Sequence, residues 1–224
     1  DEGYVVTQET PFYAESGGQI GDIGMISSEN GLAQVVDTKK ISGLIVHKCK
    51  MTSGKIILGD SVDLEVEFNW RLNTSRNHTA THVLQAILKK ILGNHVIQKG
   101  SLNANDKLRF DFLHSGVITN EQIHEIEQQV CDVIDISLPV MVQEKSYDDA
   151  IKEGALALFG ERYPENVRVV KIGENFSTEL CGGAHLENTS QIGSFRIVSL
   201  SSVGSGIKRI EAITGRQVHE FYNN

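Results

Sequence analysis

Cysteine is scarce in this chain, which has three cysteines among its 224 residues: Cys49, Cys131 and Cys181. An odd, sparse set of thiols argues against a disulfide framework and indicates a reducing compartment, so we expect a cytoplasmic protein. Cys131 lies in a helical pattern and Cys49 in a strand-like stretch, and we expect both to be small buried side chains.

Long apolar runs are also missing. No stretch approaches the roughly 18 apolar residues that a membrane-spanning helix needs, so we expect no membrane contact. The first residues, DEGYVV, have neither the basic region nor the apolar region of a secretory signal. They also lack an initiator methionine, which suggests a piece of a longer protein.

A basic excess is absent too, because 21 Lys and Arg stand against 29 Asp and Glu, for a net charge of −8. Nucleic-acid-binding proteins usually carry a positive excess, since phosphate contacts supply most of their nonspecific affinity. Any role on RNA must therefore rest on local patches or on segments missing here. Candidates for such contacts, each also readable as an ordinary solvated charge, are Lys89, Lys90, Lys99, Arg196, Lys208 and Arg209.

A small β-barrel is predicted over residues 1–68, where short alternating runs are separated by turn signals such as Glu29-Asn30-Gly31. The stretch 11–22 interrupts this pattern and is too rich in glycine for a helix or a strand. It is either a barrel connection that needs positive φ or a loop that touches a substrate. The predicted strands cover residues 4–7, 32–37, 43–48 and 61–67.

A second domain is predicted over residues 69–224, because the hydrophobic period changes there from about 2 to about 3.6. Its first helix ends at Gly93, and capping boxes at Thr119 and Ser146 open two more, the last running through 150–159 to Gly160. Helices and strands alternate without a strict βαβ rhythm, which favours an α+β fold with a largely antiparallel sheet and helices on it. The other predicted elements are strands 95–101, 107–113, 139–143, 167–172, 194–200 and 207–213, and a helix at 215–224.

Two short-range pairs of metal-ligand residues stand out. His78 and His82 are four residues apart on the predicted helix and so lie on one face of it. Cys181 and His185 are also four apart, beside two glycines. Together they offer three imidazoles and a thiolate, a donor set that suits Zn²⁺ better than Mg²⁺ or Ca²⁺.

Two other interpretations of these residues stay open. Cys181 could be a nucleophile with His185 as its base, although such dyads usually join distant segments. A purely structural zinc is the other, since four protein ligands complete a tetrahedron and catalytic zinc sites normally keep a position for water.

Neighbouring residues offer polar groups to this site. Thr81 precedes His82 and could place a hydroxyl near the metal, or bond back to a helix carbonyl. Gln98 and Ser101 lie on the strand after the helix and, on sequence alone, face solvent. Gly182 and Gly183 allow close backbone approach to a ligand, though a tight turn would need them too.

Several motifs together resemble the editing region of the alanyl-tRNA synthetase family, and the resemblance covers nearly the whole chain. Free-standing alanyl-tRNA editing proteins share its core, whereas the editing domain of the threonyl enzyme shares only the two metal-ligand pairs. The motifs are PFYAESGGQIGD, RNHTATHVLQAILKKILGNHVIQKGSL, RFDF, ALALFGERY, FSTELCGGAH and IGSFRIVSLSSVGSGIKRIEAITG.

The resemblance implies a zinc-dependent hydrolase that removes wrongly attached serine or glycine from the alanine tRNA. It implies that the aminoacylated 3′ end of that tRNA and the remaining domains of the synthetase are partners. The metal ligands it implies are His78, His82, Cys181 and His185, with Thr81 and Gln98 on the substrate side. The family usually has Thr where this chain has Ala184, which leaves the ligands intact but removes a neighbouring hydroxyl.

On this basis we expect Thr81 to test the serine hydroxyl and a water, on zinc or held by Gln98, to attack the ester carbonyl. The predicted catalytic residues are Thr81, Gln98 and Cys181, and Ser101, Gly182 and Gly183 are predicted to contact substrate. The alternative functions are a noncatalytic RNA-binding module with a structural zinc, a cysteine hydrolase, and editing of threonine tRNA. The first and last motifs argue against the editing of threonine tRNA.

Overall fold

The computed structural model describes residues 2–157 and 163–223. By internal contacts the chain divides into two compact units, Asp1–Leu72 and Asn73–Asn224. Helix α1 (Phe68–Leu92) begins in the first unit and continues into the second. The sequence placed the domain boundary between residues 68 and 69, at the start of this helix.

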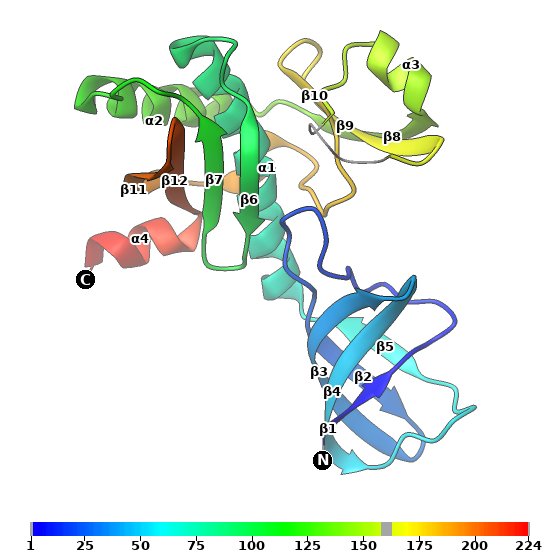
Figure 1. The fold of residues 1–224 in the computed structure, drawn as a ribbon. Helices are drawn as coiled ribbons and strands as arrows, with labels where there is room; N and C mark the ends of the chain where they lie inside the picture. Colours follow the sequence, from blue (N-terminus) through cyan, green and yellow to red (C-terminus); the bar gives the residue numbers. More distant parts are fainter. Residues whose placement is uncertain (1, 158–162, 224) are drawn as a thin grey trace. The chain divides into compact units, whose positions relative to one another are not determined.

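The first unit contains a five-stranded antiparallel sheet in the order β1-β4-β3-β2-β5 (Figure 1). Strands β1 and β5 form its edges, and no pairing joins them within residues 2–157 and 163–223, so closure into a barrel stays a prediction. Its core consists of Phe12, Ile26, Ala33, Val35 and Cys49. The strands are β1 (Glu2–Val5), β2 (Gly24–Ser28), β3 (Gly31–Ile41), β4 (Leu44–Gly54) and β5 (Asp63–Val66).

Strand β2 is missing from the sequence prediction. Of its five residues, GMISS, only Ile26 is fully buried, and a glycine and two serines make up most of the rest. Its strand character comes from pairing with β3 and β5 on its two sides, which no local pattern reveals.

The glycine-rich loop 11–22 is held inside the first unit by its last residue. Asp22 is fully buried and accepts hydrogen bonds from the backbone N–H of Tyr13, at 2.6 Å, and from Arg71 Nε, at 2.9 Å. Gly17 and Gly18 have φ of +57° and +79°, values that favour glycine. The positive φ values agree with the first of the two interpretations of this loop, a connection between strands.

The second unit contains two antiparallel sheets rather than the one sheet predicted (Figure 1). One has the order β11-β12-β7-β6 and the other the order β10-β9-β8. Its further elements are β6 (Gln98–Asn103), β7 (Leu108–Leu113), α2 (Asn120–Asp135), β8 (Val140–Ser146), α3 (Tyr147–Lys152), β9 (Asn166–Ile172), β10 (Ser177–Leu180), the 3-10 turn η1 (Thr189–Ile192), β11 (Phe195–Gly204), β12 (Ile207–Thr214) and α4 (Arg216–Asn223).

Helix boundaries follow the capping signals closely. Thr119 caps α2 with both hydrogen bonds of a capping box, and Gly93, with φ of +113°, follows the end of α1. The prediction that the third helix runs through 150–159 is confirmed as far as Lys152 and wrong for residues 153–157, because α3 ends at Lys152 and Gly154 takes φ of +86°. The rest of that prediction, with Phe159 and Gly160, lies outside the described residues.

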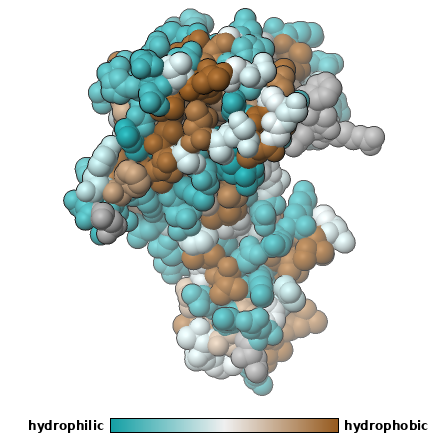
Figure 2. All heavy atoms as spheres, turned by 60° about the vertical axis from the view of Figure 1, so that its left-hand side comes forward, coloured by the Kyte–Doolittle hydropathy of each residue, from teal (hydrophilic) through white to brown (hydrophobic). Residues whose placement is uncertain are grey.

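Large apolar side chains are exposed in the second unit, and Figure 2 shows hydrophobic residues between hydrophilic ones on the face turned forward. Ile136 and Val203 are examples, with 64% and 44% of their surface exposed. Scattered exposure of this kind is ordinary for proteins. No helix among the described residues has the length and apolar character that crossing a membrane requires.

Candidate metal centre

Helix α1 buries an unusual number of polar side chains. Its second half has the ordinary apolar face, with Leu84, Ile87 and Leu88 in the core. Its middle instead buries His78 and His82, whose rings stack with centroids 5.3 Å apart. Buried polar groups need partners, so this part of the helix is where a ligand or a hydrogen-bond network must lie.

The segment after β10 brings Cys181 and His185 to this helix. Strand β10 pairs with β9, and the Arg168 side chain from β9 donates hydrogen bonds to the backbone carbonyls of Cys181 (3.0 Å) and Gly183. These bonds fix the glycine turn from the outside. The backbone N–H of Gly183 points inward, 3.5 Å from Cys181 Sγ.

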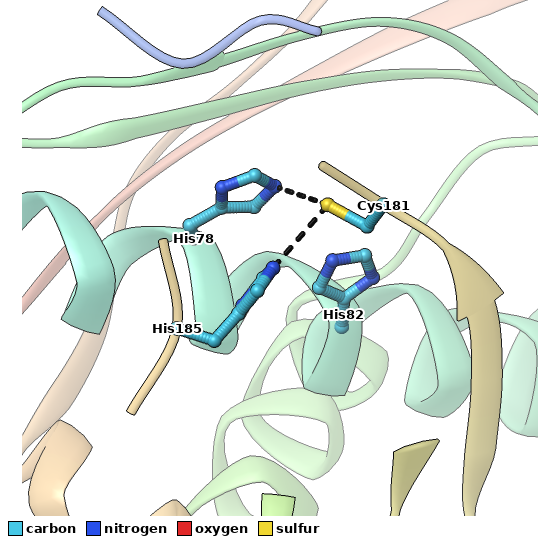
Figure 3. A group of neighbouring side chains, drawn as sticks. All are labelled: His78, His82, Cys181 and His185. Atoms are coloured by element: carbon cyan, nitrogen blue, oxygen red, sulfur yellow. Dashed lines mark hydrogen bonds between the residues drawn. The ribbon is translucent and has the colours of Figure 1, made fainter. Parts of the chain in front are cut away.

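The four predicted ligands therefore form one cluster (Figure 3). Cys181 Sγ lies 3.3 Å from His78 Nε2 and 3.2 Å from His185 Nε2. His82 completes the group, and the ligand atoms of all four residues lie within 4.8 Å of one another. Residues that are about a hundred positions apart in the sequence thus offer donor atoms to a single point that could hold a metal ion.

Glu179 orients His82. Its carboxylate lies 2.8 Å from His82 Nδ1 and also accepts hydrogen bonds from Ser177 Oγ (2.8 Å) and Gln85 Nε2 (3.2 Å). With Nδ1 engaged, His82 Nε2 is buried and has no hydrogen-bond partner among the described residues. A carboxylate on the far nitrogen of a histidine is the usual arrangement behind a metal ligand.

Thr79 performs the same task for His185. Its hydroxyl lies 3.3 Å from His185 Nδ1 and accepts a hydrogen bond from the backbone N–H of Leu186 at 3.2 Å. The contact directs the other nitrogen of the ring, Nε2, toward Cys181.

The electrostatics of the cluster favour a cation. Burial raises the pKa of the Cys181 thiol, but the surrounding histidines, His78 first, bring it well below its usual value. Burial lowers the pKa of His185, and His78 lowers it further, to about 3. Burial also disfavours a charge on His82, yet Glu179 and Cys181 hold the pKa of His82 well above its usual value. A thiolate and a neutral imidazole are the protonation states that bind metal, so Cys181 and His185 can ligate directly, and a metal ion at His82 would take the place of its proton.

Thr81 and Gln98 are held by different hydrogen bonds. Thr81 is buried on α1, and its hydroxyl bonds back to the carbonyl of Asn77 at 2.9 Å, as the simpler sequence interpretation allowed. Gln98 on β6 is half-buried rather than solvent-facing, and its Nε2 donates to Ser101 Oγ at 3.2 Å.

A β-bulge between Gln98 and Gly100 brings Gln98 and Ser101 together. Gln98 pairs with Phe112 and Ser101 pairs with Phe110, and paired residues of neighbouring strands point to the same face. Without the extra residue, two positions three apart would face opposite ways. No local pattern in the sequence reveals the bulge, and both side chains are half-buried rather than facing solvent.

The paired glycines and two of the basic candidates have other surroundings. Gly182 has open space where a side chain would stand, and Gly183 is tied by Arg168. Of the basic candidates, Arg209 forms an ion pair with Asp111 at 2.7 Å and Arg196 with Glu127 at 2.8 Å.

Sequence reasoning missed Glu179, Thr79 and Arg168. Glu179 could have been found, because an extended strand through Thr178–Leu180 places residues two apart, such as 179 and 181, on one side. Thr79 and Arg168 carry no local signal, since their partners lie far away in the sequence.

Two family models match the chain. One, described as threonyl and alanyl tRNA synthetase second additional domain, matches residues 167–211, which include Cys181 and His185. The other, described as tRNA synthetases class II (A), matches residues 1–70.

The chain is also similar to curated proteins. It is 51% identical to alanine–tRNA ligase of Caldicellulosiruptor saccharolyticus, over 99% of this chain and 25% of that protein. It is 52% identical to the ligase of Lawsonia intracellularis and 50% identical to that of Rickettsia prowazekii, in each case over 96% of this chain. The chain spans about a quarter of the length of these relatives.

Proposed function

Because the chain belongs to the alanine–tRNA ligase family, as a segment of about a quarter of its relatives' length, we propose that it is an editing region. Its substrate is alanine tRNA that carries serine or glycine by mistake, and its reaction is hydrolysis of the ester that joins the amino acid to the tRNA. The aminoacylated 3′ end and the other domains of the ligase are its proposed partners.

One observation carries this proposal: four ligand side chains from α1 and from the turn after β10 converge, and His82 Nε2 has no hydrogen-bond partner in the part of the chain that the structure describes. Zinc bonds of about 2.0–2.1 Å to nitrogen and about 2.3 Å to sulfur give a tetrahedron with edges of about 3.3–3.6 Å. Sulfur–nitrogen edges lie at the long end of that range, at about 3.5–3.6 Å. The two sulfur–nitrogen distances, 3.3 and 3.2 Å, are about 0.2–0.4 Å shorter than such edges, so small shifts of the side chains would admit the ion. The residues therefore fit Zn²⁺, which would supply a Lewis acid beside the ester.

The chain's own residues hold and select the substrate in this proposal. Glu179 and Thr79 keep the ligand rings in place, and Arg168 keeps the glycine turn close to the cluster. Gln98 and Ser101 face the same side of β6 and form a polar pair that can position a water or the terminal ribose. Thr81 reads the hydroxyl of serine.

Selectivity is the physical reason for an editing site in addition to the pocket that selects alanine. A pocket for alanine cannot shut out the smaller glycine, and it rejects serine by only about 1–3 kcal/mol. A site with polar groups for the serine hydroxyl leaves them unpaired when alanine enters, and so spares the correct product.

Two rival functions each have an observation in their favour. Four protein ligands can close a tetrahedron completely, which is typical of a structural zinc in a noncatalytic RNA-binding module. The 3.2 Å contact between Cys181 Sγ and His185 Nε2 is also the distance expected of a nucleophile and its base.

The test measures zinc content and release of serine and glycine from mischarged alanine tRNA, for the wild type and for Cys181→Ala. We expect the variant to lose both the metal and the hydrolysis. A structural zinc predicts metal without hydrolysis in the wild type. A cysteine hydrolase predicts hydrolysis that resists chelators and stops on alkylation, and either result would overturn the proposal.

Mischarged threonine tRNA serves as the specificity control. Preferential release of serine from threonine tRNA would move the substrate to that tRNA and contradict the alanine assignment.

A further inference from the structure

A buried asparagine that is not among the predicted site residues contacts Thr81. Asn103, at the end of β6, is fully buried, and its Oδ1 lies 2.6 Å from Thr81 Oγ1. Its Nδ2 is also buried and has no hydrogen-bond partner among residues 2–157 and 163–223. A buried amide with an unpaired nitrogen is costly, and such a group calls for an explanation.

The hydrogen bonds around Thr81 constrain its single proton. The hydroxyl contacts two acceptors, the Asn77 carbonyl at 2.9 Å and Asn103 Oδ1 at 2.6 Å, and it cannot donate to both. If the proton goes to Asn77, the Asn103 amide must turn its NH₂ group toward Thr81. If the proton goes to Asn103, Nδ2 stays unpaired. In both arrangements the proton remains inside the protein.

The Thr81 oxygen can therefore offer a substrate only lone pairs. A hydroxyl whose proton is committed accepts hydrogen bonds and does not donate them. A serine side chain can supply the donor, whereas glycine and alanine side chains have none. The orientation of the Thr81 hydroxyl thus sets which chemical group it recognises.

Asn103 lies on the strand face that carries the other polar residues of the proposed site. Asn103, Ser101 and Gln98 pair with Leu108, Phe110 and Phe112, so all three point to the same side of β6. The contact with Thr81 shows that this side faces α1. A second bond, from Asn77 Nδ2 to the Ala104 carbonyl at 2.8 Å, ties the helix to the end of the strand.

We infer that Asn103 is a positioning residue that, together with the Asn77 carbonyl, holds Thr81 as a hydrogen-bond acceptor for the hydroxyl of a β-hydroxy amino acid ester. The inference rests on the proposed editing function. It assigns Asn103 no contact with the reacting atoms and no part in holding the metal.

The test compares serine release with glycine release from mischarged alanine tRNA, because glycine lacks the hydroxyl that Thr81 reads. In Asn103→Ala we expect kcat/KM for serine release to fall by about 2- to 12-fold, the range of one neutral hydrogen bond. Glycine release and zinc content are expected to match the wild type. Asn103→Asp keeps an acceptor in place and is expected to restore the ratio to within about twofold.

A double-mutant cycle with Thr81→Val separates positioning from a general structural role. Once the hydroxyl is removed, Asn103→Ala is expected to leave the serine-to-glycine ratio unchanged. Asn105→Ala is the matched control, since Asn105 follows two residues later and its backbone carbonyl makes the contact with Gln217. We expect the wild-type ratio in this control.

Equal losses of serine and glycine release in Asn103→Ala, or the same loss of ratio in the Thr81→Val background, would overturn the inference. Failure of the proposed function looks different, because the wild type would then release neither amino acid. If Asn103→Ala does not fold, the Asn103→Asp ratio decides. A ratio near that of Thr81→Val contradicts the inference, and a ratio near that of the wild type supports it.

Discussion

His47 in the first unit and His82 in the second are both buried, but they complete their hydrogen bonds differently. The ring nitrogens of His47 lie 3.0 Å from the Val5 carbonyl and 2.8 Å from Thr10 Oγ1, so both are used inside the protein. His82 uses Nδ1 on Glu179 and leaves Nε2 without a partner among the described residues.

The pKa values of the two histidines also differ: that of His47 is lowered and that of His82 is raised. Burial lowers the pKa of His47, and the bond to Val5 only partly offsets this. Burial also acts against a charge on His82, but Glu179 reverses the outcome and the pKa rises well above its usual value. His47 is thus neutral with both ring nitrogens bonded, whereas His82 lies where positive charge is favoured and has no partner for Nε2 among the described residues.

The largest expected effect contrasts His82→Ala with His47→Ala in zinc binding. Removing one of four ligands should abolish stoichiometric zinc in His82→Ala, because the remaining site is incomplete. His47→Ala should retain the metal, since that side chain belongs to the other unit's sheet. Metal analysis of the purified variants measures this, and zinc loss in both or in neither would remove the distinction.

An intermediate effect is expected from the carboxylate behind His82. Glu179→Ala should weaken zinc affinity by about 10- to 100-fold, because the Nδ1 partner sets the orientation and basicity of the ring. Glu179→Gln keeps an acceptor oxygen and should recover part of the loss. Competition with a chromophoric chelator gives the affinities. Unchanged zinc affinity in Glu179→Ala would show that the carboxylate plays no part in the site.

The smallest effect concerns pH and the first unit. His47 has a lowered pKa when folded, so below about pH 6.5 the unfolded state binds more protons. Stability of the first unit should therefore fall as the pH drops through that value. In His47→Gln this part of the pH dependence should vanish.

Urea unfolding at pH 7 and pH 5 measures this effect. The only tryptophan, Trp70, donates its indole N–H to the Gly21 carbonyl at 3.0 Å within the first unit, so its fluorescence reports that unit. Parallel pH dependences in wild type and His47→Gln would contradict the assignment.

The sequence was sufficient for the parts of the site that depend on short-range spacing. A helical period places His78 with His82, and the glycine turn places Cys181 with His185, so each half could be foreseen. The capping box at Thr119 and the stop at Gly93 are likewise local, and both are confirmed. The family model and the similar ligases confirm the resemblance drawn from the motifs.

Other features depend on contacts that no local pattern records. Strand β10 is short and went unpredicted, and with it the carboxylate of Glu179. The bulge after Gln98 changes the face of that residue, because an extra residue reverses the alternation of a strand. Asn103 acquires its position only when β6 lies against α1, about twenty residues earlier in the chain.

X-ray absorption at the zinc edge of the metal-loaded chain tests the central claim most directly. We predict three nitrogen ligands at about 2.0–2.1 Å and one sulfur ligand at about 2.3 Å, and no zinc signal from Cys181→Ala, which is expected to lose the metal. A shell of oxygen and nitrogen without sulfur, or one unchanged in Cys181→Ala, would contradict a single centre built from α1 and the turn after β10.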